Sequence, residues 1–225
     1  GGVEMLSIRE HRFPFLKKVE NWNRFNRFTG GTFVEKCCHF FDLMRLVTLS
    51  EPVQVMASGG QVCNHLAEKY EGEKPDIWDC GYAIVDFENG TRSMLELCMF
   101  AEGSKYQEEI SAVGKLGKIE CKIIGPKRFW NKESGLQPES KLITSCRITK
   151  AIVEQEVRVK PELLDAGDHN GSTYYQHEKF YKVVTEGKEV EVDLHDGLWA
   201  VRMGLAAQLS SVEGRVVKMS EFQSP

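Results

Sequence analysis

Turn signals between short apolar segments place the strongest constraint on the fold of this chain. Two apolar runs, 77–86 and 91–100, flank Glu88-Asn89-Gly90, and an Asn-Gly pair favours the positive φ angles of a tight β-hairpin turn. The same pattern recurs from Glu108 to Ile124 around Gly114-Lys115-Leu116-Gly117. Strands joined by hairpins are antiparallel neighbours, so these signals predict a largely antiparallel sheet.

Further strands extend the predicted sheet. Alternating or continuous apolar residues predict strands over 3–10 and 53–61. Apolar residues also predict strands over 128–130 and 145–159, with a polar loop around Pro138 between them.

Only three segments predict helices, and few of them stand between strands. The expected helices cover 32–49, 172–185 and 196–212. The last of these has Asp196 as its candidate N-cap and Gly214 as its C-cap. A hairpin-connected sheet with three helices predicts an α+β class, with the helices on one face of the sheet and residues 1–225 in a single domain.

The composition argues against several classes of partner. A net charge of −4 leaves no basic stripe for phosphates, so we expect no nucleic-acid partner. No apolar run approaches the roughly 20 residues that span a bilayer, so we expect no membrane segment. The seven cysteines are scattered, mostly in apolar segments and without a CxxC pair. They indicate reduced core thiols, and hence a cytoplasmic location.

The densest chemistry lies in the predicted helix that follows Gly30-Gly31. One stripe of this helix is apolar and comprises Phe33, Cys37, Phe40, Met44 and Val47. Glu35, His39 and Asp42 lie on the other side, at helical spacings of four and three residues. A carboxylate beside an imidazole can orient it and raise its basicity, which suits proton transfer near neutral pH. The alternative is the solvated face of an amphipathic helix without chemistry.

The segment from Gly30 to Asp42 resembles the Gfo/Idh/MocA family pattern G-G-x-x-x-D-x-x-x-H-x-x-D. The resemblance implies that His39 is the catalytic base and that Glu35, in the place of the usual aspartate, is its catalytic partner beside the substrate carbinol. Asp42 fills the following acid position and is expected to bind substrate. The extra methylene of Glu35 moves its carboxylate outward, which bears on the substrate's identity more than on the reaction type.

The resemblance continues along most of the chain. The strand 79–87 is similar to one strand of the family's central hairpin, and 114–117 to its G-x-x-G turn. Segment 167–171 resembles the family's G-x-H-x-G motif, and 196–200 the start of its last helix. This order implies the C-terminal, substrate-binding domain of a two-domain dehydrogenase that oxidises a CH–OH group of a sugar or cyclitol such as inositol.

NAD or NADP is the cofactor that the resemblance implies. No G-x-G-x-x-G motif follows a predicted strand in this chain, and the family carries this Rossmann motif in a preceding domain. We therefore expect the chain to contribute no cofactor-binding residues and to meet a nicotinamide that another domain holds.

Further substrate contacts are expected outside the Glu35/His39 helix. Segment 11–29 is aromatic and basic, and Arg12, Trp22 and Asn23 within it could line a polyol pocket. The alternative is a set of surface residues with an anchoring tryptophan. His169 lies in a glycine-flanked segment and is a further candidate for substrate binding, with a role in capping the next helix as the alternative.

Three other functions compete with this one. Cys37-Cys38-His39 invites a zinc site, but adjacent helical cysteines point about 100° apart, so we expect no metal site. The main rival is a non-catalytic dimerisation or scaffold module descended from the same family, followed by a lone small-molecule binding protein. Three helices can cover only one face of the sheet, so we expect a homodimer or homotetramer formed through the other face.

Overall fold

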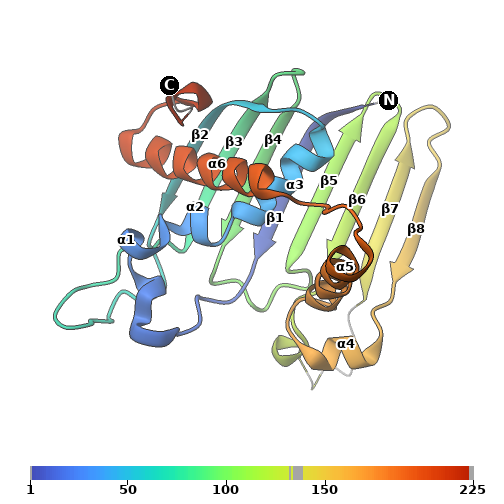
Figure 1. Ribbon diagram of the computed structural model, residues 1–225. Helices are drawn as coiled ribbons and strands as arrows, with labels where there is room; N and C mark the ends of the chain where they lie inside the picture. The colour runs from blue at the N-terminus through green and yellow to red at the C-terminus, as the bar shows by residue number, and fades with distance from the viewer. Residues whose placement is uncertain (1, 132, 134–138, 223–225) are drawn as a thin grey trace.

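The structure is a computed structural model that describes residues 2–131, 133 and 139–222. Within these residues one nine-stranded sheet has the order β8-β7-β6-β5-β1-β4-β3-β2-β9 (Figure 1). The strands are β1 (Val3–His11), β2 (Pro52–Gly60), β3 (Cys80–Phe87), β4 (Arg92–Cys98), β5 (Glu108–Gly114), β6 (Gly117–Ile123), β7 (Ser140–Cys146), β8 (Ile152–Val157) and β9 (Val217–Lys218). The central strand β1 runs parallel to β4, and every other neighbouring pair is antiparallel. The prediction of a largely antiparallel sheet is therefore confirmed.

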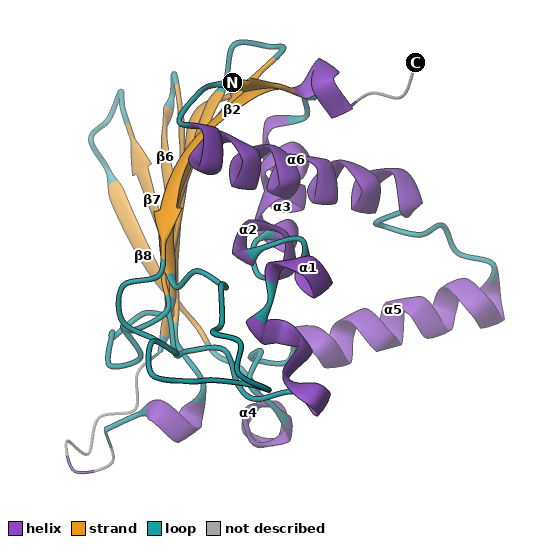
Figure 2. Cartoon of the chain, turned by 90° about the vertical axis from the view of Figure 1, so that its left-hand side faces the viewer, coloured by secondary structure: helices purple, strands orange, loops and turns teal. Residues whose placement is uncertain are grey.

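The helices lie on one side of this sheet (Figure 2). They are α1 (Asn26–Thr29), α2 (Thr32–Glu35), α3 (Cys38–Thr48), α4 (Pro161–Ala166), α5 (Ser172–Glu186) and α6 (Leu194–Glu213). Helix α6 packs on β2 and on both α2 and α3, and α3 also contacts β1. This arrangement confirms the expected α+β class. In the part of the chain that the structure describes, no helix is long and apolar enough to cross a membrane.

Two predicted strands are wrong. Segment 145–159 is not one strand, because the chain turns between β7 and β8 and Lys150 takes a left-handed conformation there, with φ of 61°. Residues Lys127–Phe129 form a short 3₁₀ helix after Pro126 instead of a strand over 128–130. The loop expected around Pro138 lies outside the described residues.

The start of the last helix also differs from the prediction. Asp193, not Asp196, is the N-cap of α6: its carboxylate accepts hydrogen bonds from the backbone N–H groups of His195 and Asp196. Asp196 stands three residues later and accepts from the Asp193 N–H at 3.0 Å, which completes a capping box. Gly214 is the C-cap, as expected.

The core lies between the sheet and the layer formed by α2, α3 and α6. Within this layer, the backbones of α6 and α2 lie close together at Gly204. An added Cβ there would lie 2.8 Å from the carbonyl oxygen of Phe33 and 2.9 Å from the Cα of Val34. These are backbone atoms, which cannot move aside as the end of a side chain can. Glycine at this position therefore allows the backbone of α6 to pack directly against the backbone of α2.

The other face of the sheet carries no described helix. Across β2, β3 and β4, a row of apolar side chains points out of this face: Met56 pairs with Ile84, and Ile84 pairs with Met94. These three side chains are 50%, 42% and 37% exposed, respectively. The neighbouring row on the helix side, Ala57, Ala83 and Leu95, packs in the core. The sheet is thus covered on one face only.

The contact at Gly204 leads to a prediction with a control in the same helix. Gly204→Ala should lower the free energy of unfolding by about 1–3 kcal/mol, because the new methyl group overlaps the backbone of α2. Gly197 meets no atom within 4 Å of an added Cβ, so Gly197→Ala should be neutral or stabilise α6 by up to about 1 kcal/mol. Urea unfolding followed by circular dichroism measures both. Equal midpoints for the two variants would contradict the close contact.

Candidate active site

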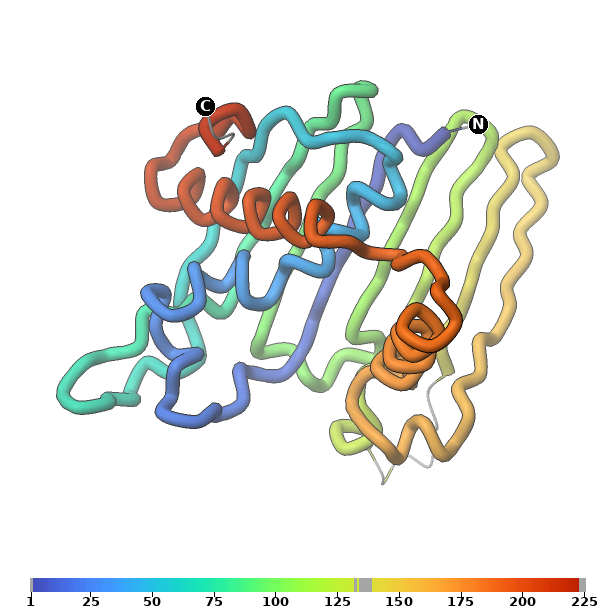
Figure 3. The backbone as a smooth tube through the Cα atoms, viewed as in Figure 1, coloured from blue at the N-terminus to red at the C-terminus, as the bar shows by residue number. Residues whose placement is uncertain are grey.

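Two consecutive glycines, Gly30 and Gly31, connect α1 to α2 at the start of the candidate site. Gly30 ends α1 with φ of 76°, and Gly31 precedes α2 with φ of 98°. Both angles lie in the region that glycine alone adopts readily. Figure 3 follows the backbone from the end of β1 through residues 12–29 and back over the sheet into α2 and α3.

The helix expected over 32–49 is interrupted in the middle of the motif. Helix α2 ends at Glu35 and α3 begins at Cys38, with Lys36 and Cys37 between them. The apolar stripe survives the break, because Phe33 and Phe40 are 1% and 2% exposed. The break changes the relation between Glu35 and His39, which no longer stand one turn apart on one continuous helix.

The interruption directs Lys36 towards the central strand. Its Nζ lies 3.1 Å from Oε1 of Glu10, near the end of β1, and an Arg12 guanidinium nitrogen lies 3.2 Å from the same oxygen. Glu10 is fully buried, while the Lys36 and Arg12 side chains are only 11% and 12% exposed. A buried carboxylate needs such partners, because an isolated buried charge is strongly unfavourable. The pair of cations is therefore fixed in place beneath the helices.

His39, the second residue of α3, lies near this ion cluster. Its ring lies 4.1 Å, centroid to centroid, from the ring of Phe40, over which the Lys36 ammonium stands at 5.8 Å. The His39 side chain keeps substantial exposed surface, although many protein atoms lie around the ring and exclude water from part of it. This burial, followed by the positive charges of Lys36 and Arg12, lowers the pKa of His39 below its ordinary value of 6.5. The ring is therefore neutral at physiological pH and can accept a proton.

Glu35 is half-buried beside the same cations. Burial raises the pKa of its carboxyl group, and the charges of Lys36, Arg12 and Lys18 act in the opposite direction. Among the described residues, no hydrogen bond joins Glu35 to His39. The role expected for Glu35, orienting the imidazole, therefore remains a prediction.

Asp42 lies one turn further along α3, in a different environment. It lines an open cleft of about 1020 Å³ together with Arg45, Glu51 and Asp196. Burial and the charge of Asp196 raise the pKa of Asp42, and Arg45 opposes them. Arg45 is fully engaged, with Glu51 at 2.7 Å and Asp196 at 2.9 Å. Asp42 thus belongs with this cleft by its contacts, and its expected role in binding substrate stays a prediction.

The segment before α5 also lies near His39. His169 is near enough for a positive charge on it to lower the pKa of His39. Its backbone carbonyl accepts hydrogen bonds from the N–H and hydroxyl of Ser172, which closes a turn before α5, whose N-cap is Gly171. The neighbouring Asp168 pairs with Arg128 at 2.5 Å. The His169 side chain is not the cap of α5, and its expected role in binding substrate stays a prediction.

The three residues expected from segment 11–29 separate into two kinds. Arg12 belongs to the ion cluster and also covers the Phe13 ring at 4.2 Å. Asn23 is 1% exposed and donates to the Leu16 carbonyl at 2.8 Å, which ties the segment to itself. Trp22 is 39% exposed. Contacts of Asn23 and Trp22 with substrate stay predictions.

Two charged members of the cluster, Glu10 and Lys36, were missed by the sequence analysis. A signal for Glu10 existed, because alternation along β1 puts it on the same face as the buried Leu6 and Ile8. A charged residue at a core position of a central strand indicates a partner or a function. Lys36 offered no such signal, since its direction depends on the break after Glu35.

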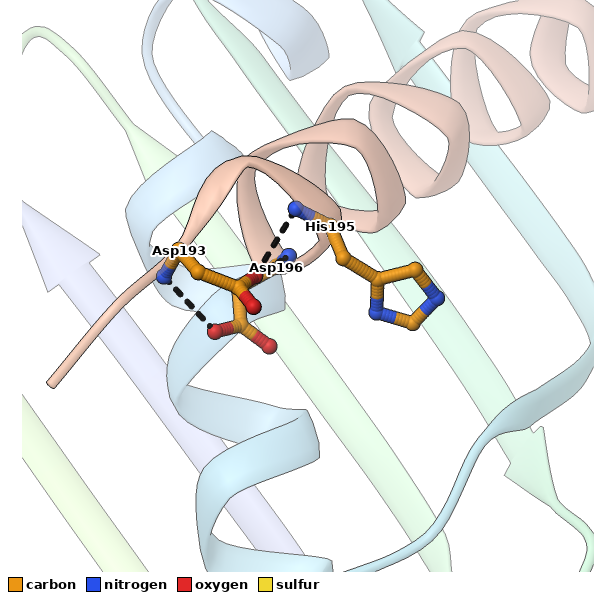
Figure 4. Close-up of side chains that lie close together, drawn as sticks. All are labelled: Asp193, His195 and Asp196. Atoms are coloured by element: carbon orange, nitrogen blue, oxygen red, sulfur yellow. Dashed lines mark hydrogen bonds between the residues drawn. The ribbon is translucent and has the colours of Figure 1, made fainter. Parts of the chain in front are cut away.

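One group of side chains has the composition of a metal site, and it lies elsewhere. Among the described residues, only Asp193, His195 and Asp196 bring three such groups together (Figure 4). The two aspartates already form the capping box of α6, and the His195 ring accepts a hydrogen bond from the Trp199 indole at 3.1 Å. These contacts account for the group without an ion. All seven cysteines, including Cys37 and Cys38, are free thiols.

The one-sided, mostly antiparallel sheet matches the fold of one class of protein, the C-terminal α/β domains of oxidoreductases. The family model described as "Oxidoreductase family, C-terminal alpha/beta domain" matches residues 1–219. The chain therefore belongs to the Gfo/Idh/MocA family. A search of curated proteins gave no match.

Solved structures share this fold at low sequence identity. A candidate myo-inositol dehydrogenase from Sinorhizobium meliloti has a TM-score of 0.66 and 20% identity, over 97% of this chain and 57% of that one. An oxidoreductase from Agrobacterium radiobacter in complex with NAD+, L-tartaric acid and magnesium has a TM-score of 0.68 and 14% identity, over 99% of this chain and 58% of that one. Aldose-aldose oxidoreductase from Caulobacter crescentus, complexed with glycerol, has a TM-score of 0.64 and 16% identity, over 97% of this chain and 56% of that one. The chain spans less than two thirds of each of these proteins.

The lowered pKa of His39 predicts a loss of stability in acid. The unfolded chain takes up a proton near pH 6.5 at this residue, whereas the folded chain does so only at lower pH, so the free energy of unfolding should fall as the pH drops below about 6.5. His39→Asn should flatten this dependence between pH 7 and 5. His177→Asn, at an exposed position of α5, is the control and should leave it unchanged. Thermal unfolding across this range tests the prediction, and identical slopes for His39→Asn and the original chain would contradict it.

Proposed function

We propose that this chain presents a CH–OH group of a sugar or cyclitol to the nicotinamide of NAD or NADP held by a separate nucleotide-binding domain. The observation that carries the proposal is the position of His39, a partly exposed imidazole near the buried ion cluster of Glu10, Lys36 and Arg12 at the end of the central strand. A neutral imidazole is the form that can take a proton from a hydroxyl group.

The residues of this chain would act on the substrate side of the reaction. His39 accepts the hydroxyl proton, and the fixed charges of Lys36 and Arg12 favour the alkoxide character that develops on the substrate oxygen. Glu35, half-buried beside them, binds a neighbouring hydroxyl. The cofactor supplies the acceptor for the hydride, and the chain carries no glycine-rich fingerprint that would hold it.

The relatives support a small polyhydroxy substrate. One similar structure contains NAD+ and L-tartaric acid, another contains glycerol, and a third is a candidate myo-inositol dehydrogenase. Each extends well beyond the part that this chain matches, which fits a cofactor domain outside the substrate domain.

The proton-transfer role of His39 can be tested in the two-domain protein. His39→Ala should lower kcat by roughly 10² to 10⁴-fold, because the general base is lost while the fold is retained. Glu35→Gln should have a smaller effect, since an amide still accepts one hydrogen bond. His177→Ala is the control on α5. Turnover with a panel of polyols and NAD or NADP gives the readout, and a loss below tenfold for His39→Ala would remove His39 from the reaction.

The uncovered sheet face supports a second proposal, that the chain self-associates through it. Met56, Ile84 and Met94 form a continuous apolar row on that face, and an isologous contact between two copies would bury it. Such association would also serve a scaffold module, so it does not depend on catalysis.

Light scattering on the purified chain at micromolar concentration decides the oligomeric state. We expect a mass of two or four times 25.6 kDa, and Ile84→Lys should shift it to the monomer by placing a charge in the row. Val212→Lys, at a 68% exposed position on α6, should leave the mass unchanged. A concentration-independent monomer for the original chain would overturn the proposal.

A further inference from the structure

Two acidic side chains face each other beneath the helices. Glu10 of β1 and Glu108 of β5 are direct partners in the antiparallel register. Directly opposed residues project to the same face, with Cβ atoms about 4.5–5.5 Å apart. Ile8 and Ile110, the preceding pair on this face, pack in the core. The two carboxyl groups therefore project into the same space, in which Glu10 is fully buried and Glu108 is partly buried.

Glu10 uses only one of its two oxygens. Oε1 receives both Arg12 and Lys36, at 3.2 and 3.1 Å. Oε2 is buried and has no hydrogen-bond partner among the described residues. A buried acceptor without a donor is strongly unfavourable. While both carboxyl groups are ionised, no described group donates a hydrogen bond to this oxygen.

Glu108 lacks a cation of its own in the described part of the chain. Its Oε1 accepts one long contact, at 3.5 Å, from the amide of Gln107. Burial and the charge of Glu10 raise the pKa of Glu108, against the opposing charges of Lys36 and Arg12. Two neighbouring carboxyl groups with too few cations are stabilised when one of them keeps its proton.

We propose that Glu10 and Glu108 share one proton in the folded chain, with the Glu108 hydroxyl donating to Oε2 of Glu10. This contact satisfies the unpaired oxygen and leaves Oε1 free to hold Arg12 and Lys36. The pair is thus a positioning group for the two cations beside His39. Its positioning role in catalysis rests on the proposed function, whereas the shared proton does not, so the test below reads the proton directly.

Infrared spectroscopy distinguishes a carboxylic acid from a carboxylate. At pH 5.5, above the ordinary glutamate pKa of 4.5, the original chain should show the carbonyl stretch of a protonated carboxyl group, and Glu108→Gln should lose it. Glu109→Gln is the matched control, because Glu109 neighbours Glu108 but bonds Lys122 at 2.9 Å; it should keep the band. Absence of the band from the original chain, or its persistence in Glu108→Gln, would overturn the proposal.

Stability across pH gives a second, independent measurement. The folded chain holds the Glu108 proton more tightly than the unfolded chain, so the pair's contribution is complete below pH 4.5 and is lost as the pH rises through the raised pKa. Glu108→Gln keeps an N–H donor for Oε2 and should match the original chain at pH 5 without this decline. Glu108→Leu leaves Oε2 unpaired and should unfold at lower urea. An unchanged pH profile in Glu108→Gln would count against a shared proton, even if Glu108→Leu fails to fold.

Discussion

The structure depends on covering one face of a central sheet with a thin helical layer. The apolar residues of β1 to β4 on that face are nearly all buried, and α2, α3 and α6 supply the cover. The layer is thin because α6 meets α2 backbone to backbone at Gly204. The helix in contact there, α2, begins directly after Gly30-Gly31 and ends at the break after Glu35. The candidate site is therefore a by-product of how the core closes.

Electrostatics then determine what this site can do. Glu10 brings a negative charge into the core, and Arg12 and Lys36 neutralise it. Burial of the His39 ring is the main cause of its lowered pKa, and the same two cations add to this effect. A burial that costs free energy thus fixes the protonation state of a nearby group, which is a common way for a fold to prepare proton chemistry.

The sequence was informative where local patterns decide the structure. The Asn89-Gly90 turn, the second hairpin and the apolar stripe from Phe33 to Met44 all follow from local chain properties. The break between α2 and α3 was not predictable, because helical periodicity continues through it and only packing against β1 and α6 reveals it. Lys36 lies at that break and pairs with Glu10 near the end of β1, 26 positions earlier in the sequence. No spacing rule relates the end of a strand to a junction between two helices.

Helix α5 sets a limit on how rigid one side of this site can be. None of its 15 residues is buried, and Figure 2 shows it extending away from the sheet. Isolated helices of this length are only marginally stable in water. Its backbone amides should therefore exchange with solvent through local opening, at a much smaller free-energy cost than global unfolding. His169 lies just before this helix, so motion of α5 reaches the site only through segment 168–171. Asn170 holds that segment to the Ile124 carbonyl at 2.8 Å, and Asp168 holds it to Arg128 at 2.5 Å.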